Sequence, residues 1–144
     1  MVFRSGTGKM GKSEGNGIFL RDEPSVIRKK VMKAVTDLGP TEMNQKKPEV
    51  IENLFTMLKV VSSPDTVEYF NNQYNSCQIR YGDLKKQLAE DIIKAMEPIR
   101  ERIKEIESDD EYLRKVVTLG AEKARESAIK TLAEVREIMG FRKF

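Results

Sequence analysis

Residues 84–106 read LKKQLAEDIIKAMEPIRERIKEI, and this stretch carries the clearest structural signal in the chain. Its apolar side chains recur every three or four residues, which is the spacing of one face of an α-helix. They are Leu84, Leu88, Ile92, Ala95, Ile99, Ile103 and Ile106. Most positions between them are charged. The pattern therefore predicts a long amphipathic helix that buries one face against other helices.

Helix signals continue on both sides of this segment. Four further helices are predicted to begin at Asp22-Glu23-Pro24, Pro48, Ser63-Pro64-Asp65 and Ser108-Asp109-Asp110-Glu111. Aspartate and serine cap helix starts, and proline is tolerated in the first turn because no N–H is needed there. Asp22 is expected to cap the first helix, which is predicted to end at Leu38-Gly39-Pro40, and Gly140 to close the last one. The fold class is all-α, an antiparallel helical bundle of about five helices.

The last helix offers a face of small side chains, at Gly120, Ala124 and Ala128. Small residues allow a neighbouring helix to approach closely. We therefore expect the long helix to pack its apolar face on this stripe, with Leu88, Ile92, Ile99 and Ile103 in the core. Lys85 and Lys86 are expected to face solvent.

Composition excludes several classes of site. The chain has 144 residues, enough for one ordinary domain, and a net charge of +3 in which both signs are mixed. It has no histidine and a single cysteine, Cys77, so an internal disulfide and a zinc knuckle are excluded, and no metal site is predicted. No run of 18 apolar residues marks a membrane span, and the first residues do not resemble a signal peptide.

Residues 6–17 read GTGKMGKSEGNG, a flexible, glycine-rich segment that has two incompatible interpretations. Gly6 to Ser13 fits G-x-x-x-x-G-K-[ST], the Walker A pattern of P-loop nucleotidases. Lys9 to Ser13 also fits, with one change, the KMSKS loop of class I aminoacyl-tRNA synthetases. Both interpretations place lysine ammonium groups on a loop beside a polyphosphate.

The Walker A interpretation needs a buried strand before the loop and a helix directly after it. Residues 1–5 are too short and too basic for a central strand. Gly15 and Gly17 make an immediate helix start unfavourable, at about 1 kcal/mol for each glycine. No later apolar strand ends in an aspartate that could hold Mg²⁺. The sequence thus disfavours a P-loop nucleotidase.

Short matches run in order along nearly the whole chain from residue 6 onward. They are Lys9-Met10-Gly11-Lys12-Ser13, Asn16, Ile18, Leu20, Asp22, Ile27, Lys30, Ala34-Val35-Thr36-Asp37, Tyr81-Gly82-Asp83-Leu84-Lys85, Leu88-Ala89, Pro98-Ile99, Glu101-Arg102, Gly120-Ala121-Glu122-Lys123-Ala124 and Met139-Gly140-Phe141. Each match is weak alone, but the ordered set resembles the tryptophanyl-tRNA synthetase family of class I aminoacyl-tRNA synthetases. The resemblance is to the C-terminal portion, from just before the KMSKS loop through the helical anticodon-binding domain.

The resemblance implies two parts, a KMSKS-type catalytic loop in residues 1–20 and an anticodon-binding helical domain in residues 21–144. The implied chemistry is tryptophan--tRNA ligation, in which ATP with Mg²⁺ activates tryptophan. Lys9 and Lys12 correspond to the catalytic lysines, and ATP binding is implied for Lys9, Met10, Gly11, Lys12 and Ser13. Gly11 replaces the family's usual serine and removes one hydrogen-bond donor.

The resemblance also implies partners. These are the anticodon region of tRNA(Trp), an N-terminal Rossmann-type catalytic domain that this sequence does not contain, and a second copy in a cytoplasmic homodimer. Because the HIGH motif is absent, the isolated chain is expected to be inactive and to hold no cofactor. Basic and aromatic residues predicted to contact tRNA are Arg28, Lys29, Lys33, Arg80, Tyr81, Lys85 and Lys86. Tyr81 is equally suited to the core.

Three other functions stay open on the sequence alone. The chain could be a free-standing tRNA-binding module without ligase activity. It could be a helical oligomerisation domain with a glycine-rich arm, or a P-loop nucleotidase. ATP binding by the isolated chain would favour the last of these, and salt-dependent tRNA binding would favour the first.

Overall fold

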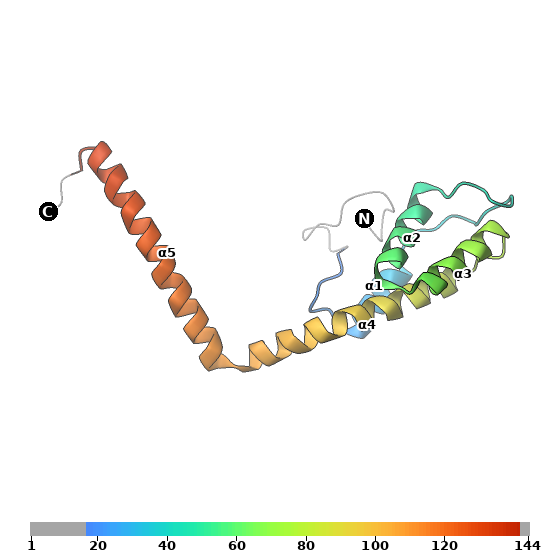
Figure 1. Cartoon of the computed structure of the whole chain (residues 1–144), viewed down its shortest axis with the longest axis horizontal. Helices are drawn as coiled ribbons and strands as arrows, with labels where there is room; N and C mark the ends of the chain where they lie inside the picture. Colours follow the sequence, from blue (N-terminus) through green and yellow to red (C-terminus); the bar gives the residue numbers. More distant parts are fainter. Residues whose placement is uncertain (1–16, 142–144) are drawn as a thin grey trace. The chain divides into compact units, whose positions relative to one another are not determined.

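A computed structural model describes residues 17–141 of the chain, and within them every regular element is a helix (Figure 1). The helices are α1 (Pro24–Met32), α2 (Glu49–Val61), α3 (Pro64–Asn75), α4 (Tyr81–Ser108) and α5 (Asp110–Ile138). The predicted all-α fold and its five helices are confirmed. The glycine-rich loop at residues 6–16 lies outside the described range.

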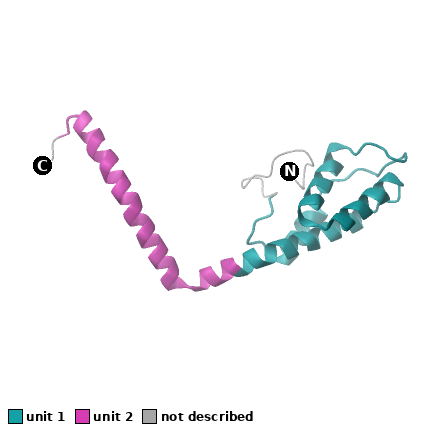
Figure 2. Cartoon of the chain, viewed as in Figure 1, with its two compact units in different colours: residues 1–101 teal, residues 102–144 magenta. Residues whose placement is uncertain are grey.

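The chain divides into two compact units, Met1–Glu101 and Arg102–Phe144 (Figure 2). The hydrophobic core belongs to the first unit, where α2 and α3 lie side by side and the first half of α4 joins them (Figure 1). Its fully buried side chains include Ile27, Val31, Ile51, Phe55, Leu58, Tyr74, Leu84 and Leu88. This core holds the ends of α1 and α4 in fixed positions, and the basic side chains discussed below lie on those ends.

Local signals predicted most helix starts correctly. The Ser63 hydroxyl accepts a hydrogen bond from the Thr66 N–H at α3, and the Asp109 carboxylate accepts one from the Tyr112 N–H at α5. Gly140, with φ of 72°, follows the end of α5 in the left-handed conformation that favours glycine.

The first helix differs from its prediction at both ends. Glu23, not Asp22, occupies the N-cap position, and no side chain caps the helix. Asp22 instead accepts hydrogen bonds from the Phe19 N–H and from Lys30. The helix ends at Met32, six residues before Leu38, because residues 33–39 form an irregular segment that Asp37 organises through its side chain.

The burial predicted along α4 is confirmed only in the first half of the helix. α4 buries Leu84, Leu88 and Ile92, but Ile99 on the same predicted face is 43% exposed. α5 buries none of its residues, and a Cβ atom added at Gly120 would meet nothing within 4 Å. Apolar spacing predicts that a helix has a face suited to burial, but it does not identify what covers that face. Among the helices that the structure describes, none is long and apolar enough to cross a membrane.

Candidate catalytic loop anchor and RNA-binding surface

The five residues of the KMSKS-like segment, Lys9 to Ser13, lie outside the described residues. What the structure describes is the segment that connects them to α1. Gly17 is buried and Ile18 packs against the core, so these two residues lie against the helical unit, whereas residues 19–21 are exposed.

Lys30 on α1 holds this connecting segment in place. Its ammonium group donates hydrogen bonds to the Gly17 carbonyl oxygen at 2.8 Å and to the Asp22 carboxylate at 2.6 Å. The same group lies 4.8 Å from the centre of the Phe19 ring, which is a cation–π contact. The side chains of Lys30 and Asp22 are only 22% and 15% exposed, so solvent screens this ion pair weakly. Lys30 therefore anchors the chain where the predicted loop segment, residues 1–20, meets the helical unit.

Arg28, one of the predicted tRNA-binding residues, joins α1 to α4. Its Nε and one terminal nitrogen donate to the two carboxylate oxygens of Glu90, at 2.6 Å and 2.9 Å. The hydrogen bond from Arg28 lowers the pKa of Glu90, and the same bond raises the pKa of Arg28. Both side chains are half exposed. Because two nitrogens of the guanidinium group donate to Glu90, fewer of its N–H groups are left to bind a phosphate.

Tyr81, the predicted stacking residue, faces inward. Its ring packs against the hydrophobic core, and its hydroxyl donates to the Asp37 carboxylate at 2.6 Å. Burial, followed by the hydrogen bond to Asp37 and the charge of that carboxylate, raises the pKa of Tyr81 well above its usual range. The side chain thus ties the first residue of α4 to the segment that follows α1.

Lys85 lies one helical turn beyond Tyr81, and its side chain is also partly buried. Its ammonium group is 3.4 Å from the Thr36 hydroxyl, to which it donates, and partial burial lowers the pKa of Lys85. The expectation that Lys85 faces solvent is therefore wrong. The helix brings Lys85 to the same side as Tyr81 because residues four apart share a helix face.

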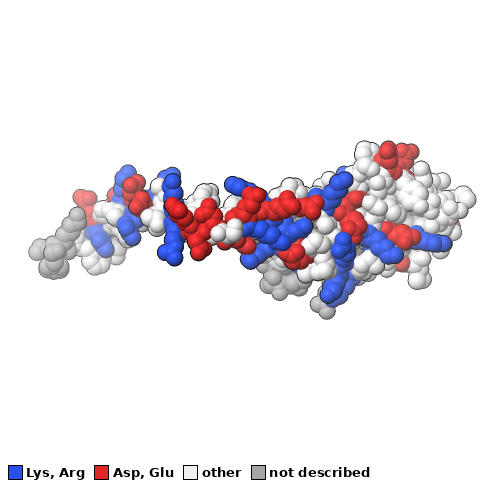
Figure 3. All heavy atoms as spheres, turned by 90° about the horizontal axis from the view of Figure 1, so that it is seen from below, with Lys and Arg blue, Asp and Glu red and all other residues white. Residues whose placement is uncertain are grey.

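The remaining predicted residues, Lys29, Lys33, Arg80 and Lys86, are exposed. Lys86 lies 3.9 Å from Asp83, a loose pair between exposed side chains that contributes little to stability. On the face drawn in Figure 3, basic and acidic side chains are intermixed over the helices. These four cations are the ones best placed to meet an RNA phosphate, and that contact stays a prediction. Across residues 17–141, no group of three or more Cys, Asp or Glu residues could hold a metal ion.

Comparison with known proteins identifies the family. A family model described as tRNA synthetases class I (W and Y) matches residues 1–97. The chain belongs to this family. The match extends over the KMSKS-like segment and so favours the synthetase interpretation of that segment over the Walker A one.

Individual relatives of this synthetase chain agree. It is 62% identical over 137 residues to a tryptophan--tRNA ligase from Porphyromonas gingivalis, covering 95% of this chain and 42% of the relative. It is 41% identical to a tryptophan--tRNA ligase from Helicobacter pylori, covering 92% of this chain and 40% of the relative. The chain therefore spans about two fifths of the length of these curated relatives.

A solved structure shares the fold. The crystal structure of tryptophanyl-tRNA synthetase from Campylobacter jejuni complexed with ADP and tryptophan has a TM-score of 0.73 and 24% identity, covering 98% of this chain and 44% of the other. At this identity the likeness concerns the fold alone.

Sequence reasoning missed three residues that shape the candidate site, namely Lys30, Asp37 and Glu90. Lys30 and Asp37 are among the residues that carry the family resemblance, and this was the one sequence feature that could have marked them as part of the site. No sequence signal marked Glu90, whose partner Arg28 is 62 residues away.

Proposed function

We propose that this chain forms the C-terminal part of a tryptophan--tRNA ligase and contributes both the KMSKS loop and the tRNA-binding helices. The observation that carries the proposal is the 62% identity to the Porphyromonas gingivalis ligase, which extends over 95% of this chain. The activity of the whole enzyme needs the Rossmann-type domain with the HIGH motif. This chain contains no histidine and so cannot supply that motif.

The proposed chemistry gives the loop lysines a defined part. The carboxylate of tryptophan attacks the α-phosphorus of ATP, and the bond from that phosphorus to the bridging oxygen breaks. Tryptophanyl-adenylate forms and pyrophosphate leaves, with negative charge growing on the leaving group. The ammonium groups of Lys9 and Lys12 would stabilise that charge, and Ser13 would donate a hydrogen bond to a phosphate oxygen. Mg²⁺ bound with ATP would neutralise further phosphate charge, and the described side chains are assigned no part in holding it.

The position of Lys30 supports the idea that loop and helices work as one piece. Lys30 fixes residues 17–22 to α1 through three contacts, so the loop that precedes residue 17 is tethered to the helical unit. This attachment would limit the distance between the two loop lysines, Lys9 and Lys12, and the ATP site of the catalytic domain. The loop would then lose less conformational entropy when it closes over ATP.

The helical unit is proposed to bind the anticodon region of tRNA(Trp). Lys29 on α1, Lys33 at the C-cap of α1 and Lys86 on α4 are exposed cations. Phosphate contacts of this kind position RNA without reading its sequence. The protein would act in the cytoplasm as a homodimer of the complete enzyme. Tyr81 and Lys85 would act indirectly, by fixing the first turn of α4.

Electrophoretic mobility shift of tRNA(Trp) by the chain tests the RNA-binding half of this proposal. Affinity should fall steeply as salt rises, and duplex DNA of equal charge should bind more weakly. The double variant Lys33→Gln/Lys86→Gln should weaken binding and flatten its salt dependence, while Lys130→Gln, an exposed cation on α5, should leave both unchanged. Equal affinity for tRNA and duplex DNA would contradict a tRNA-binding role.

A further inference from the structure

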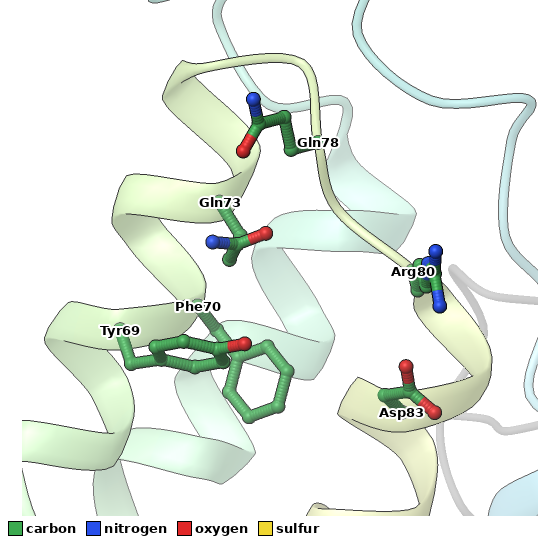
Figure 4. A pocket seen from close by; sticks show the side chains of 6 residues that line it. All are labelled: Tyr69, Phe70, Gln73, Gln78, Arg80 and Asp83. Carbon is green, nitrogen blue, oxygen red and sulfur yellow. The ribbon is translucent and has the colours of Figure 1, made fainter.

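A cavity of about 440 Å³ lies at the junction of α3 and α4, within the first unit. Its lining residues are Tyr69, Phe70, Gln73, Gln78, Arg80 and Asp83. Figure 4 shows Tyr69, Phe70 and Gln73 on the α3 side, Arg80 and Asp83 on the α4 side, and Gln78 on the connecting turn. This volume falls in the range of small-molecule sites in proteins.

The turn that closes the cavity is built by backbone hydrogen bonds. The Gln78 N–H donates to the Gln73 carbonyl at 2.8 Å, and the Cys77 N–H donates to the Tyr74 carbonyl at 3.1 Å. With Cys77 at φ of 58°, these bonds form a Schellman motif that ends α3. The motif turns the chain back so that Gln78 lies over Gln73. The wall of the cavity is therefore preformed.

The opposite wall is fixed as well. The Arg80 carbonyl accepts hydrogen bonds from the Asp83 and Leu84 N–H groups and so begins α4. The next residue, Tyr81, donates a hydrogen bond to the Asp37 carboxylate, which follows α1 in the chain. Arg80 and Asp83 thus project from a helical turn whose backbone is held at both sides, although their side chains are exposed.

One of the aromatic rings that line the cavity, that of Tyr69, is largely exposed to solvent. Tyr69 is 57% exposed, and its ring meets the buried Phe70 ring edge to face, with 5.1 Å between centroids and 77° between planes. This contact orients the Tyr69 ring and leaves much of its surface in solvent. A rigid, exposed aromatic ring is a platform on which another flat ring can stack.

Polar groups around this ring point to a ligand with mixed hydrogen-bonding edges. The amides of Gln73 and Gln78 each offer donors and an acceptor, and Asp83 offers only acceptors. Arg80 supplies a planar cationic fork suited to a phosphate. A phosphate group alone would face the negative charge of Asp83, which the loose pair with Lys86 offsets only in part, and an apolar ligand would make no use of the two amides. A nucleobase with its phosphate satisfies all four groups.

We propose that this cavity binds one unstacked base of single-stranded RNA. The base stacks on Tyr69, its hydrogen-bonding edge meets Gln73 and Gln78, and Arg80 pairs with the adjoining phosphate. Asp83 accepts a hydrogen bond from an exocyclic amine, so bases that carry one are preferred to uracil. The inference rests on the proposed function in one respect, since that function makes RNA the partner polymer.

Nuclear magnetic resonance titration of the full chain with tricytidylate and triuridylate tests the pocket directly. The side-chain amide signals of Gln73 and Gln78 should shift with tricytidylate, and triuridylate should bind more weakly. The pocket is ruled out if those signals stay fixed up to millimolar trinucleotide, or if the shifts are confined to other residues. Equal affinity for the two trinucleotides would show that Asp83 does not select bases with an exocyclic amine.

Substitutions at Tyr69 separate stacking from general electrostatic binding. Tyr69→Leu should weaken tricytidylate binding at least about fivefold, the low end of base stacking on an aromatic ring. Tyr69→Phe keeps the ring and should bind as the wild type does. Tyr112→Leu removes a tyrosine of α5 that is 46% exposed and should also leave binding unchanged. Equal affinity of the Tyr69→Leu and wild-type chains, with matching circular dichroism, would overturn the proposal.

These results are distinguishable from failure of the proposed function. If Tyr69→Leu leaves both trinucleotide and tRNA(Trp) affinity intact, the pocket is excluded while the synthetase assignment stands. If the trinucleotides bind as expected but a complete enzyme built with this chain charges no tRNA, the synthetase assignment fails while the base pocket remains.

Discussion

The hydroxyl of Tyr81 donates a hydrogen bond to the carboxylate of Asp37 across 2.6 Å, although the two residues are 44 positions apart in the sequence. Asp37 also accepts a hydrogen bond from the Gly39 N–H at 2.9 Å, which fixes a turn where Gly39 has φ of 105°. One carboxylate thus organises the segment after α1 and holds the start of α4. The start of α4 carries three exposed charged residues, Arg80 directly before the helix and Asp83 and Lys86 in its first two turns.

Replacing Tyr81 with phenylalanine should destabilise the first unit by about 1–2 kcal/mol near neutral pH, because the Asp37 carboxylate loses a partner while partly buried. Urea unfolding followed by far-UV circular dichroism measures this loss. An unchanged unfolding midpoint would mean that the hydrogen bond does not hold α4 in place.

The same variant should change the dependence of stability on pH. The pKa of Tyr81 is raised in the folded chain, first by burial and then by Asp37. An unfolded tyrosine loses its proton near pH 10, so above about that pH the unfolded chain binds fewer protons and stability falls as pH rises. Tyr81→Phe should lack this fall. Lys85, whose pKa is lowered, acts in the opposite direction in both proteins, so their difference isolates Tyr81.

Lys30→Ala should release residues 17–22, because it removes charge-assisted hydrogen bonds to Gly17 and Asp22. Amide hydrogen exchange in residues 17–22 should become faster, and in a complete enzyme tryptophan activation should slow. Lys29→Ala, the neighbouring exposed lysine, is the matched control and should change neither quantity. Equal exchange rates in the Lys30 variant and the wild type would refute the tether.

Core and surface substitutions on the two long helices should differ sharply. Leu88→Ala should cost about 2–5 kcal/mol, since Leu88 is fully buried. Ala124→Leu on α5 should change stability by less than about half a kcal/mol, because α5 buries no residue. A large loss in Ala124→Leu would show that α5 is packed in solution.

Much of this fold followed from local sequence rules. Ser63 and Asp109 cap their helices as predicted because a cap depends on neighbours within three residues. Contacts between distant residues could not be predicted in this way. The sequence gives no sign that Arg28 meets Glu90 or that Tyr81 meets Asp37, since tertiary packing chooses these partners. For the same reason the exposure of α5 was missed.

The candidate site was predictable only in part. Ordered short matches in the sequence indicate the class I synthetase family, and the family match over residues 1–97 confirms it. The roles of Lys9 and Lys12 stay predictions, because those residues lie outside the described part of the chain. The cavity at Tyr69 had no sequence signal at all. It arises from the turn at Cys77, which brings Gln78 over Gln73.

Lysine substitutions in a complete enzyme would test the loop chemistry. Lys12→Ala should lower kcat for tryptophan activation with little change in the tryptophan KM, at about 2–4 kcal/mol of lost transition-state stabilisation. Lys9→Ala should show the same pattern more weakly. Tryptophan-dependent pyrophosphate exchange measures both. A rise in KM alone would make Lys12 a ground-state binder.

A chimeric ligase tests the central claim most directly. In it, this chain replaces the matching 137 residues of the Porphyromonas gingivalis tryptophan--tRNA ligase, to which it is 62% identical. The measurement is attachment of tryptophan to tRNA(Trp), with the isolated chain as the inactive control. The account predicts that the chimera charges tRNA(Trp) and that Lys12→Ala within it abolishes most of that activity. A folded chimera that forms no tryptophanyl-tRNA would contradict the account.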